Sequence, residues 1–440
     1  MSDKKDNNLS KRIAIIVELK KREMAYLSIL KRLLEDRGHI VKFVSFKNHC
    51  TWSLISFRPD VILINGLRTT CPSFVSQIYI PKKLFGSRVI CYYVEQVGYF
   101  DETVAAGYNN PLILRNVECH VAWGGRFAKD LIGLGAKADN TWYIGSMQYD
   151  LDYYLRENTA SLRKKFGNHY NLDISKKWLI YCDNIMQRYT AADKYAIRRE
   201  ESFRIIEKIA QNNPESRIIF RPHPETSTEE KTVMKKRFAK YGNVVFNDEG
   251  HLFYWIMACD AMLIWQSTSA LSAIFLDKPV FGFKTSDGQD ECLYWYKKMV
   301  PTYTDHNRLV EDVTTYLQNG NYVISEETRK ARDKYISDFF YRKDGRSFNR
   351  LIALIEMFAD APKCKYADEE FRFWGIRLLL AELKQFIVDA VHGSVKDLRV
   401  NRDEELSELA KYDTARFDGS VRYVSIKTDC GNEIVEEMLK

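Results

Sequence analysis

Apolar runs and helical repeats alternate along most of this chain, beginning near its N-terminus. The apolar run RIAIIV at residues 12–17 predicts a buried β-strand, and residues 40–46 predict a second one. Between them, residues 20–37 repeat apolar positions with helical spacing, and Gly38 ends that helix. The apolar residues on its predicted buried face are Met24, Leu27, Leu30, Leu33 and Leu34. A strand, a helix and a second strand in this order predict a Rossmann-like α/β domain.

The same alternation continues through two predicted domains. Further strands of the first domain are expected at 61–64, 88–94, 118–123 and 141–144. We place this domain at residues 12–150 and a charged, helical linker at 151–176. The second domain, at residues 171–360, again alternates strands with helices. Its strands are predicted at 178–182, 217–220, 243–246, 261–265 and 279–283.

Residues 363–440 differ from the rest of the chain and predict a helical, charged C-terminal extension. Residues 371–390 are apolar on a broad face and basic at their start. One interpretation is an amphipathic helix packed on the body of the protein or on a second subunit. The other is a helix that docks on a membrane surface or on a partner complex. Residues 394–440 carry many charges.

Length and charge narrow the classes of function. The chain has 440 residues, of which 45% are hydrophobic, and this length exceeds what one compact core usually holds. The formal net charge of +7 is modest, and it suits an acidic substrate or an anionic membrane surface. No dense run of Lys and Arg with nearby aromatic residues marks a nucleic-acid groove. We therefore expect no nucleic-acid partner.

The cysteines and the apolar runs indicate a cytoplasmic protein. Its nine cysteines are scattered, and none shows the spacing of a zinc site or a disulfide framework. The polar N-terminus, MSDKKDNNLSKR, does not have the pattern of a signal peptide. No apolar run reaches the length of about 18 residues that a membrane span needs. Any contact with the inner face of the cytoplasmic membrane is therefore expected to be peripheral.

Two polar clusters follow neighbouring strands of the second domain. Arg221, His223 and Pro224 come after the strand at 217–220, and Ser267-Thr268-Ser269 comes after the strand at 261–265. Ligands of parallel α/β sheets bind beyond the carboxyl ends of the strands, where hydroxyls, imidazole and guanidinium groups can hold a phosphate. Each cluster also has a plain structural explanation, a strand exit for the first and a helix cap for the second. Their occurrence together favours a site for an activated, phosphate-bearing donor.

These residues resemble motifs of bacterial GT-B glycosyltransferases that make capsules and other surface polysaccharides. His223-Pro224 is similar to their His-Pro motif, and Ser267-Thr268-Ser269 is similar to their Ser/Thr-rich motif. Kdo transferases, capsular sialyltransferases and CDP-glycerol glycerophosphotransferases belong to this group. The resemblance covers about residues 12–360. It implies two Rossmann-like domains that face each other across a cleft, with the phosphate and ribose of a cytidine nucleotide held by the two motifs.

Two further segments carry the same resemblance. Residues 145–150, from Gly145 to Asp150, form a Gly-x-x-x-x-Asp segment. In the proteins of this group, a similar segment lies at the boundary between the first and second domains. The polar turn at 341–347, which contains Asp344-Gly345-Arg346-Ser347, is similar to a turn that precedes a helix crossing back to the first domain.

Sugar transfer needs stabilisation of the leaving phosphate and, in an inverting enzyme, a general base. Arg221, His223 and the hydroxyls of Ser267–Ser269 are suited to the first task. Glu18 and Glu95 are strand-end carboxylates of the first domain, where GT-B enzymes bind the acceptor, so they are the candidate bases. Glu95 ranks slightly ahead because Gln96 beside it offers a second hydrogen-bonding group.

Donor binding is expected to involve Asp183 and Asn184, which follow the strand at 178–182 and can hold the nucleotide base. No Asp-x-Asp motif marks a metal clamp, so we expect metal-independent transfer and no cofactor beyond a CMP- or CDP-linked sugar as co-substrate.

The leading hypothesis is a glycosyltransferase that moves a sugar from CMP-Kdo or a CMP-sialic-type donor to a glycan or lipid-linked glycan. A phosphotransferase that moves a polyol or sugar phosphate would use the same motifs. UDP-sugar epimerases share the two-domain fold but usually carry more acidic and glycine residues in the second domain. A non-catalytic subunit that binds glycan is the alternative from another class. The residues at the strand ends favour an enzyme.

Overall fold

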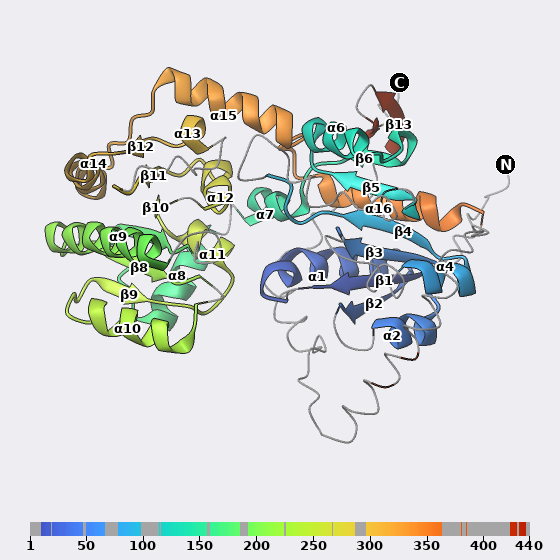
Figure 1. Cartoon of the computed structure of the whole chain (residues 1–440), viewed down its shortest axis with the longest axis horizontal. Helices are drawn as coiled ribbons and strands as arrows, with labels where there is room; N and C mark the ends of the chain where they lie inside the picture. The colour runs from blue at the N-terminus through green and yellow to red at the C-terminus, as the bar shows by residue number, and fades with distance from the viewer. Residues whose placement is uncertain are drawn as a thin grey trace. The chain divides into compact units, whose positions relative to one another are not determined.

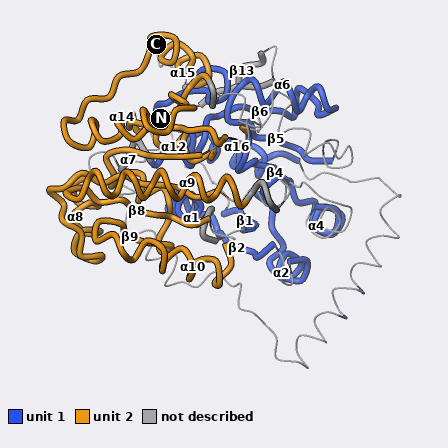
Figure 2. The backbone as a smooth tube through the Cα atoms, turned by 60° about the vertical axis from the view of Figure 1, so that its left-hand side comes forward, with its two compact units in different colours: residues 1–96, 103–154, 337–440 blue, residues 97–102, 155–336 orange. Residues whose placement is uncertain are grey.

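The chain forms two compact α/β units, shown in Figures 1 and 2. The first comprises residues 1–96, 103–154 and 337–440, and the second comprises residues 97–102 and 155–336. The computed structural model describes residues 10–18, 20–46, 50–66, 78–97, 114, 116–155, 159–184, 192–223, 226–265, 267–286, 296–362, 380, 384, 423–428 and 431–436.

The first unit is built on a sheet in the order β13-β14-β6-β5-β4-β3-β1-β2. Its strands are β1 (Arg12–Val17), β2 (Ile40–Ser45), β3 (Val61–Asn65), β4 (Arg88–Tyr92), β5 (Cys119–Ala122), β6 (Thr141–Tyr143), β13 (Tyr423–Thr428) and β14 (Gly431–Glu436). Its helices are α1 (Lys20–Asp36), α2 (Cys50–Phe57), α4 (Ile80–Phe85), α6 (Gly125–Gly133), α7 (Met147–Leu155) and α16 (Ser347–Asp360), with the 3-10 turn η3 (Ala138–Asn140). Strands β1 to β6 pair in parallel throughout.

The predicted strands of this unit are confirmed to within two residues at each end. Their apolar runs are buried because helices cover the sheet, and β3 is buried along its whole length. The sequence analysis did not predict α2 and α4. Helix α4 has six residues, with Pro81 in its first turn and Gly86 in a left-handed conformation at its end. Such short helices carry too few turns to show a helical period.

The described end of the C-terminal extension contains two strands, which the prediction of a helical, charged segment did not include. Residues 423–428 and 431–436 are the strands β13 and β14, which pair antiparallel. Strand β14 then pairs in parallel with β6 and so adds the hairpin to the edge of the first sheet. Of the segment 371–390, residues 380 and 384 alone are described, and both are helical. The rest of that predicted docking helix lies outside the described residues.

Helix α16 returns the chain to the first unit, so the second unit ends at Ile336 and not near the predicted 360. Lys11 forms an ion pair with Asp360 at 2.8 Å, and His39 contacts Glu356 at 3.3 Å. The crossing helix suggested by the resemblance therefore packs where expected.

Asp150 caps the start of α16 from a distant part of the chain. Its Oδ1 accepts a hydrogen bond from Ser347 Oγ at 3.0 Å, and its Oδ2 accepts from the Ser347 backbone N–H. A carboxylate at this position satisfies helix N–H groups that lack intrahelical partners. Gly145, which has a φ of +93°, brings the chain close to Ser347. The Gly-x-x-x-x-Asp segment and the Asp-Gly-Arg-Ser turn thus meet inside the first unit.

Asp150 makes the stability of this unit depend on pH. Burial raises the pKa of Asp150 to about 7, although the hydrogen bonds from Ser347 act to lower it. The folded state therefore holds the proton more tightly than the unfolded chain, whose aspartate pKa is about 3.9. The stability that this proton contributes is present below pH 4 and is lost as the pH rises through 7, by up to about 4 kcal/mol.

We expect Asp150→Asn, which does not titrate, to gain stability relative to the wild type as the pH rises from 4.5 to 8. Thermal unfolding midpoints of both proteins across this range would measure the difference. A difference between the two proteins that stays constant, or that shrinks, with rising pH would contradict the shifted pKa.

The second unit is built on an all-parallel sheet in the order β12-β11-β10-β7-β8-β9. Its strands are β7 (Trp178–Cys182), β8 (Arg217–Arg221), β9 (Val244–Phe246), β10 (Ala261–Ile264), β11 (Val280–Phe283) and β12 (Thr302–Tyr303). Its helices are α8 (Thr159–Tyr170), α9 (Ala192–Asn212), α10 (Thr228–Phe238), α11 (Leu252–Ala258), α12 (Ala270–Phe275), α13 (Tyr296–Met299), α14 (His306–Asn319) and most of α15 (Glu326–Phe339). The strands predicted between 178 and 283 are all present.

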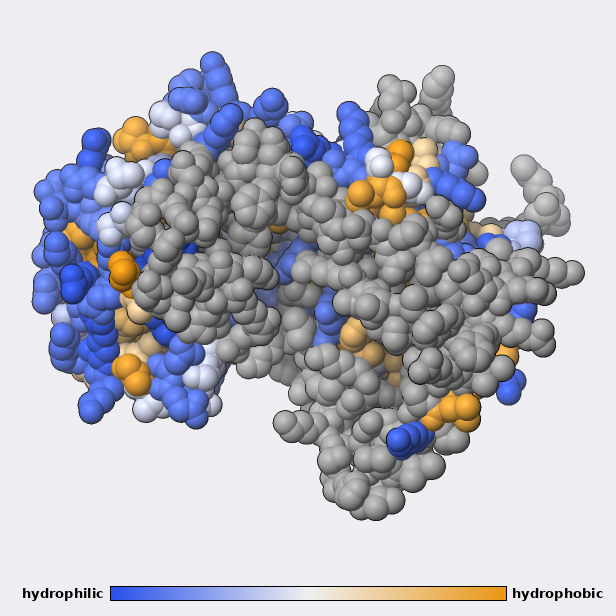
Figure 3. Space-filling model, viewed as in Figure 1, coloured by the Kyte–Doolittle hydropathy of each residue, from blue (hydrophilic) through white to orange (hydrophobic). Residues whose placement is uncertain are grey.

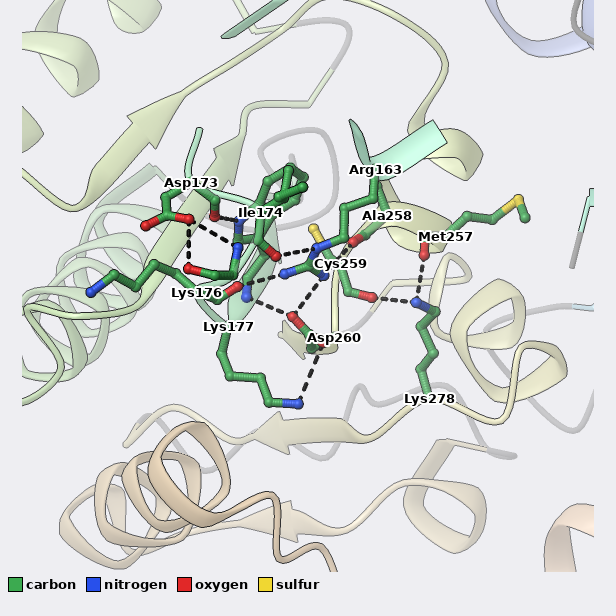
Figure 4. Close-up of polar contacts among 12 residues, drawn as sticks. Arg163, Asp173, Ile174, Lys176, Lys177, Met257, Ala258, Cys259, Asp260 and Lys278 are labelled. Carbon is green, nitrogen blue, oxygen red and sulfur yellow. Dashed lines mark hydrogen bonds and ion pairs between the residues drawn. The ribbon is translucent and has the colours of Figure 1, made fainter. Parts of the chain in front are cut away.

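Arg163 shows that α8 is part of the second unit, although its sequence predicted a linker. At the amino ends of β7 and β10 its guanidinium donates to the carbonyls of Ile174, Lys176 and Ala258 and to the Asp260 carboxylate, as Figure 4 shows. It also lies over the ring of Trp178, at 4.4 Å from the centroid. Nearby, Lys278 Nζ donates to the carbonyls of Met257 and Cys259. These cations bind backbone carbonyls, so the cluster supports the fold.

The surface of the second unit is mostly hydrophilic on the face in Figure 3, with isolated apolar side chains among the described residues. Ile197, Val233 and Val323 are exposed singly in this unit. None of the helices in the described part of the chain is both long enough and apolar enough to cross a membrane.

Candidate donor site in the second unit

The sheet register brings the predicted donor residues to one edge of the second unit. Cys182 at the end of β7 pairs with Arg221 of β8 on one side and with Ile264 of β10 on the other. Asp183, His223 and Ser267 therefore leave three adjacent strands at the same end. Strands β8 and β10 both flank β7, so their ends lie about 10 Å apart. Side chains from both can converge over the end of β7.

The hydroxyls of Ser267 and Ser269 form a pair next to this edge. Their Oγ atoms are 2.7 Å apart, and the Ser269 N–H donates to Ser267 Oγ at 3.3 Å. The Ser269 side chain makes no capping hydrogen bond to α12. The Ser269 side chain therefore does not act as a helix cap, which was the plain structural explanation of this motif. Thr268 lies between them, and its carbonyl accepts from the Leu271 N–H.

The Cys182 thiol connects the strand ends. Burial raises the pKa of Cys182 to about 12, while Arg221 and a hydrogen bond with the Ser269 side chain act to lower it. Both groups must lie near the sulfur atom for this effect. The sequence predicted that the strands at 217–220 and 261–265 are neighbours, and the structure corrects this because β7 lies between β8 and β10.

Arg221 holds the loop after β9. Its Nη1 donates to Asn247 Oδ1 at 2.5 Å and to the Glu249 carbonyl, and its Nη2 donates to the Gly250 carbonyl at 2.9 Å. All three acceptors are neutral. Burial lowers the pKa of Arg221, while the Asp248 carboxylate nearby acts to raise it, and Arg221 remains a strong base. The Arg221 N–H groups hold the loop after β9, and the positive charge of Arg221 can still act on a ligand at the end of β8.

His223 is half-buried two residues beyond Arg221, and its carbonyl accepts from the Thr226 N–H at 3.0 Å. Pro224, the second residue of the His-Pro motif, lies outside the described residues. The predicted contact of the His223 imidazole with a donor phosphate stays a prediction.

Asp183 and Asn184 are both buried at the end of β7. Burial raises the pKa of Asp183 to about 6, and Arg199 acts against this shift. Arg199 Nη2 lies 3.9 Å from Asp183 Oδ2, and its Nη1 donates to Glu230 Oε1 at 2.7 Å. Glu230 also forms a capping box with Ser227 at the start of α10. Arg199 and Glu230 therefore connect the end of β7 with the start of α10.

Arg198 and Arg199 are residues of the site that the sequence analysis missed. Arg198 is 2% exposed, and its guanidinium lies 5.6 Å from the ring centroid of Trp265, just beyond β10. A usable signal was present, because Arg198 occupies the apolar stripe of α9 that includes Phe203, Ile206 and Ile209. A charged residue on a buried stripe needs a partner or a function.

The candidate bases of the first unit lie at the carboxyl ends of its strands. Glu18 follows β1, and its carboxylate accepts from Asn65 Nδ2 at 2.5 Å. Glu95 is partly buried beyond β4. The sequence ranked Glu95 ahead because of Gln96 beside it, but the Gln96 side chain bonds the backbone. Its amide donates to the carbonyls of Tyr93 and Val121 and accepts from the Trp123 N–H. Gln96 therefore has a structural role and does not support Glu95.

Metal binding finds no support in the described part of the chain. No group of three or more His, Cys, Asp and Glu side chains there is arranged to hold an ion. Whether transfer proceeds without a metal stays a prediction.

One protein family model matches the part of the chain that contains this candidate site. Residues 156–286, which include the whole candidate donor site, match the sequence model of the family described as "Capsule polysaccharide biosynthesis protein". A search by sequence among curated proteins found no match.

Solved structures share the fold at low sequence identity. UDP-GlcNAc 2-epimerase from Neisseria meningitidis, bound to UDP-GlcNAc, is 12% identical with a TM-score of 0.54, over 78% of this chain and 99% of that chain. The wall teichoic acid polymerase TagF is 13% identical with a TM-score of 0.54, over 81% of this chain and 91% of that chain. HepE from Anabaena, in complex with UDP-glucose, is 14% identical with a TM-score of 0.44, over 78% and 98%. The chain therefore has the GT-B fold that its sequence predicted, and its residues 156–286 match the capsule polysaccharide biosynthesis family.

Proposed function

We propose that this protein is a glycosyltransferase of surface polysaccharide biosynthesis that transfers a sugar from a cytidine-activated donor to a growing glycan. The observation that carries this proposal is the edge formed by the ends of β7, β8 and β10. There Arg221 brings a positive charge to the end of β8, and Ser267 and Ser269 pair their hydroxyls beyond the end of β10. A positive, hydroxyl-bearing strand edge suits a nucleotide phosphate.

The comparisons support the same proposal. The match to the capsule polysaccharide family covers the residues that form this edge. The similar epimerase structure holds UDP-GlcNAc, and one TagF structure, with a TM-score of 0.53, was soaked with CDPG. Nucleotide-linked substrates therefore occur on this fold, and we propose one for this chain too.

In the proposed reaction, negative charge develops on the donor phosphate as its bond to the sugar breaks. His223 and the serine hydroxyls would donate hydrogen bonds to this phosphate, and Arg221 would lower its energy through its charge. Asp183 and Asn184 would hold the nucleoside. A carboxylate of the first unit would take the proton of the acceptor hydroxyl, without a metal ion.

Thermal unfolding of the purified full chain with CMP, CDP, UDP or GDP would test the donor class. A nucleotide at about 100 times its dissociation constant adds about 2.7 kcal/mol to the free energy of unfolding. We expect CMP or CDP to raise the unfolding midpoint, and UDP and GDP to leave it nearly unchanged. Stabilisation by UDP alone would contradict the cytidine assignment, and stabilisation by none would contradict the donor site.

Product analysis then separates the reactions that this fold supports. Incubation with a CMP-sugar and with CDP-glycerol distinguishes attack at the anomeric carbon from attack at phosphorus. CMP is released in both reactions, but the acceptor gains a sugar in the first and glycerol phosphate in the second. We expect free CMP and a transferred sugar. Epimerisation of UDP-GlcNAc, or binding without turnover of any donor, would overturn the proposal of a glycosyltransferase.

A further inference from the structure

Glu18 and Asn65 form a hydrogen-bonded pair at the carboxyl ends of two neighbouring strands of the first unit. Strands β1 and β3 are parallel and adjacent, which brings the residues that follow them together. Asn65 Nδ2 lies 2.5 Å from Glu18 Oε2. Asn65 is only 8% exposed, whereas Glu18 is exposed. A buried amide thus holds a carboxylate that an acceptor molecule can reach.

A third strand sets the orientation of this amide. The Val94 backbone N–H, just beyond β4, donates to Asn65 Oδ1 at 3.3 Å. Because an N–H group must bond an acceptor, Oδ1 faces Val94 and the NH2 group faces Glu18. An NH2 group only donates, so its hydrogen bond fixes the position of the Glu18 carboxylate oxygen.

The backbone of Glu18 is also fixed. Its N–H donates to Glu23 Oε2 at 2.9 Å, and Glu23 is fully buried in the first turn of α1. Glu23 is thus a second carboxylate close to Glu18, and it accepts a hydrogen bond from the Glu18 backbone N–H. Neighbouring groups therefore position both the main chain and the side chain of Glu18. A residue that must approach a hydroxyl in a defined geometry requires such positioning.

We propose that Glu18 is the general base of the transfer and that Asn65 is its positioning residue. This inference rests on the proposed glycosyltransferase function and reverses the order in which the sequence ranked Glu95 and Glu18. In the step, the proton of the acceptor hydroxyl moves to the Glu18 carboxylate, and the acceptor oxygen bonds the anomeric carbon. The bond from that carbon to the donor phosphate breaks, and its electron pair remains on the phosphate oxygen.

Asn65→Asp tests the positioning role with almost no change in size. The new side chain still accepts from the Val94 N–H but presents a carboxylate oxygen to Glu18 in place of the NH2 group. Like charges at this distance raise the pKa of one carboxyl group. With CMP-N-acetylneuraminic acid as donor, we expect the acid limb of the profile of kcat/KM against pH to move up by at least about one unit. That is a loss of about tenfold on the acid limb, with recovery at higher pH.

Glu18→Gln and Glu95→Gln test the base itself. We expect Glu18→Gln to lower kcat by about 10²- to 10⁴-fold. CDP should stabilise all three variants as it does the wild type, because the donor residues lie in the other unit. An unshifted profile in Asn65→Asp, or a larger loss in Glu95→Gln than in Glu18→Gln, would overturn this inference and leave the proposed function standing. A wild type that neither binds CDP nor releases CMP would contradict the proposed function itself.

Discussion

His223→Ala is expected to lower the release of CMP from CMP-N-acetylneuraminic acid by about 10²- to 10³-fold. This is the usual effect of removing one hydrogen-bond donor aimed at charge that develops in the transition state. His223 follows β8, and the ends of β7 and β10 lie beside that strand. The fold should survive this substitution, because the His223 side chain is only half-buried and the Arg199–Glu230 pair at the start of α10 is unchanged.

His251→Asn is the matched control for this substitution. His251 is another histidine of the second unit, and its Nδ1 accepts from the Phe253 N–H at the start of α11. Asparagine is a good residue at such a cap, so both stability and activity should remain. Steady-state rates and CDP binding of the three proteins decide the question. If His223→Ala keeps wild-type turnover, His223 has no part in the donor site.

Gly124→Ala is expected to destabilise the protein by about 3 kcal/mol. A Cβ atom at Gly124 would lie 2.6 Å from the Phe339 carbonyl carbon and 2.9 Å from the Phe340 nitrogen. Both are backbone atoms, which cannot rotate away as the end of a side chain can. The clash must therefore move a segment of main chain.

The segment that Gly124 contacts is held firmly in the first unit. The Tyr341 N–H donates to the Trp123 carbonyl at 2.9 Å. The Phe340 ring stacks on Trp123 at 5.5 Å and meets Tyr149 edge-on at 5.1 Å. Displacing residues 339 and 340 breaks this aromatic packing, which explains why relaxation should not absorb the cost.

Gly133→Ala is the control in the same helix. Gly133 is the last residue of α6, and no atom lies within 4 Å of the position that its Cβ would take. Alanine there should be neutral or stabilise by up to about 1 kcal/mol, because it loses less backbone entropy on folding. Urea denaturation of both variants measures the contrast. Equal stability of Gly124→Ala and the wild type would show that the contact with residues 339 and 340 is looser than described.

The sequence by itself determined the strands, the class of fold and the edge of the sheet that holds the predicted donor residues. Strands β7, β8 and β10 are short apolar runs between polar segments, and burial of such runs is a local property. In a parallel sheet the residue after each strand must lie at the carboxyl edge, so Asp183, His223 and Ser267 could be placed together before the structure was known.

The tertiary structure decided what each polar side chain bonds. The Asp150 carboxylate caps α16 by bonding Ser347, which lies 197 residues further along the chain. No local sequence pattern predicts such a pairing. Gln96 and Arg221 stand at strand ends like ligand-binding residues, yet they bond main-chain atoms. Asn65 follows the predicted strand at 61–64 and received no role from the sequence, yet it holds Glu18. The reason is physical: periodicity reports whether a residue is buried, whereas a hydrogen-bond partner depends on which distant segment folds beside it.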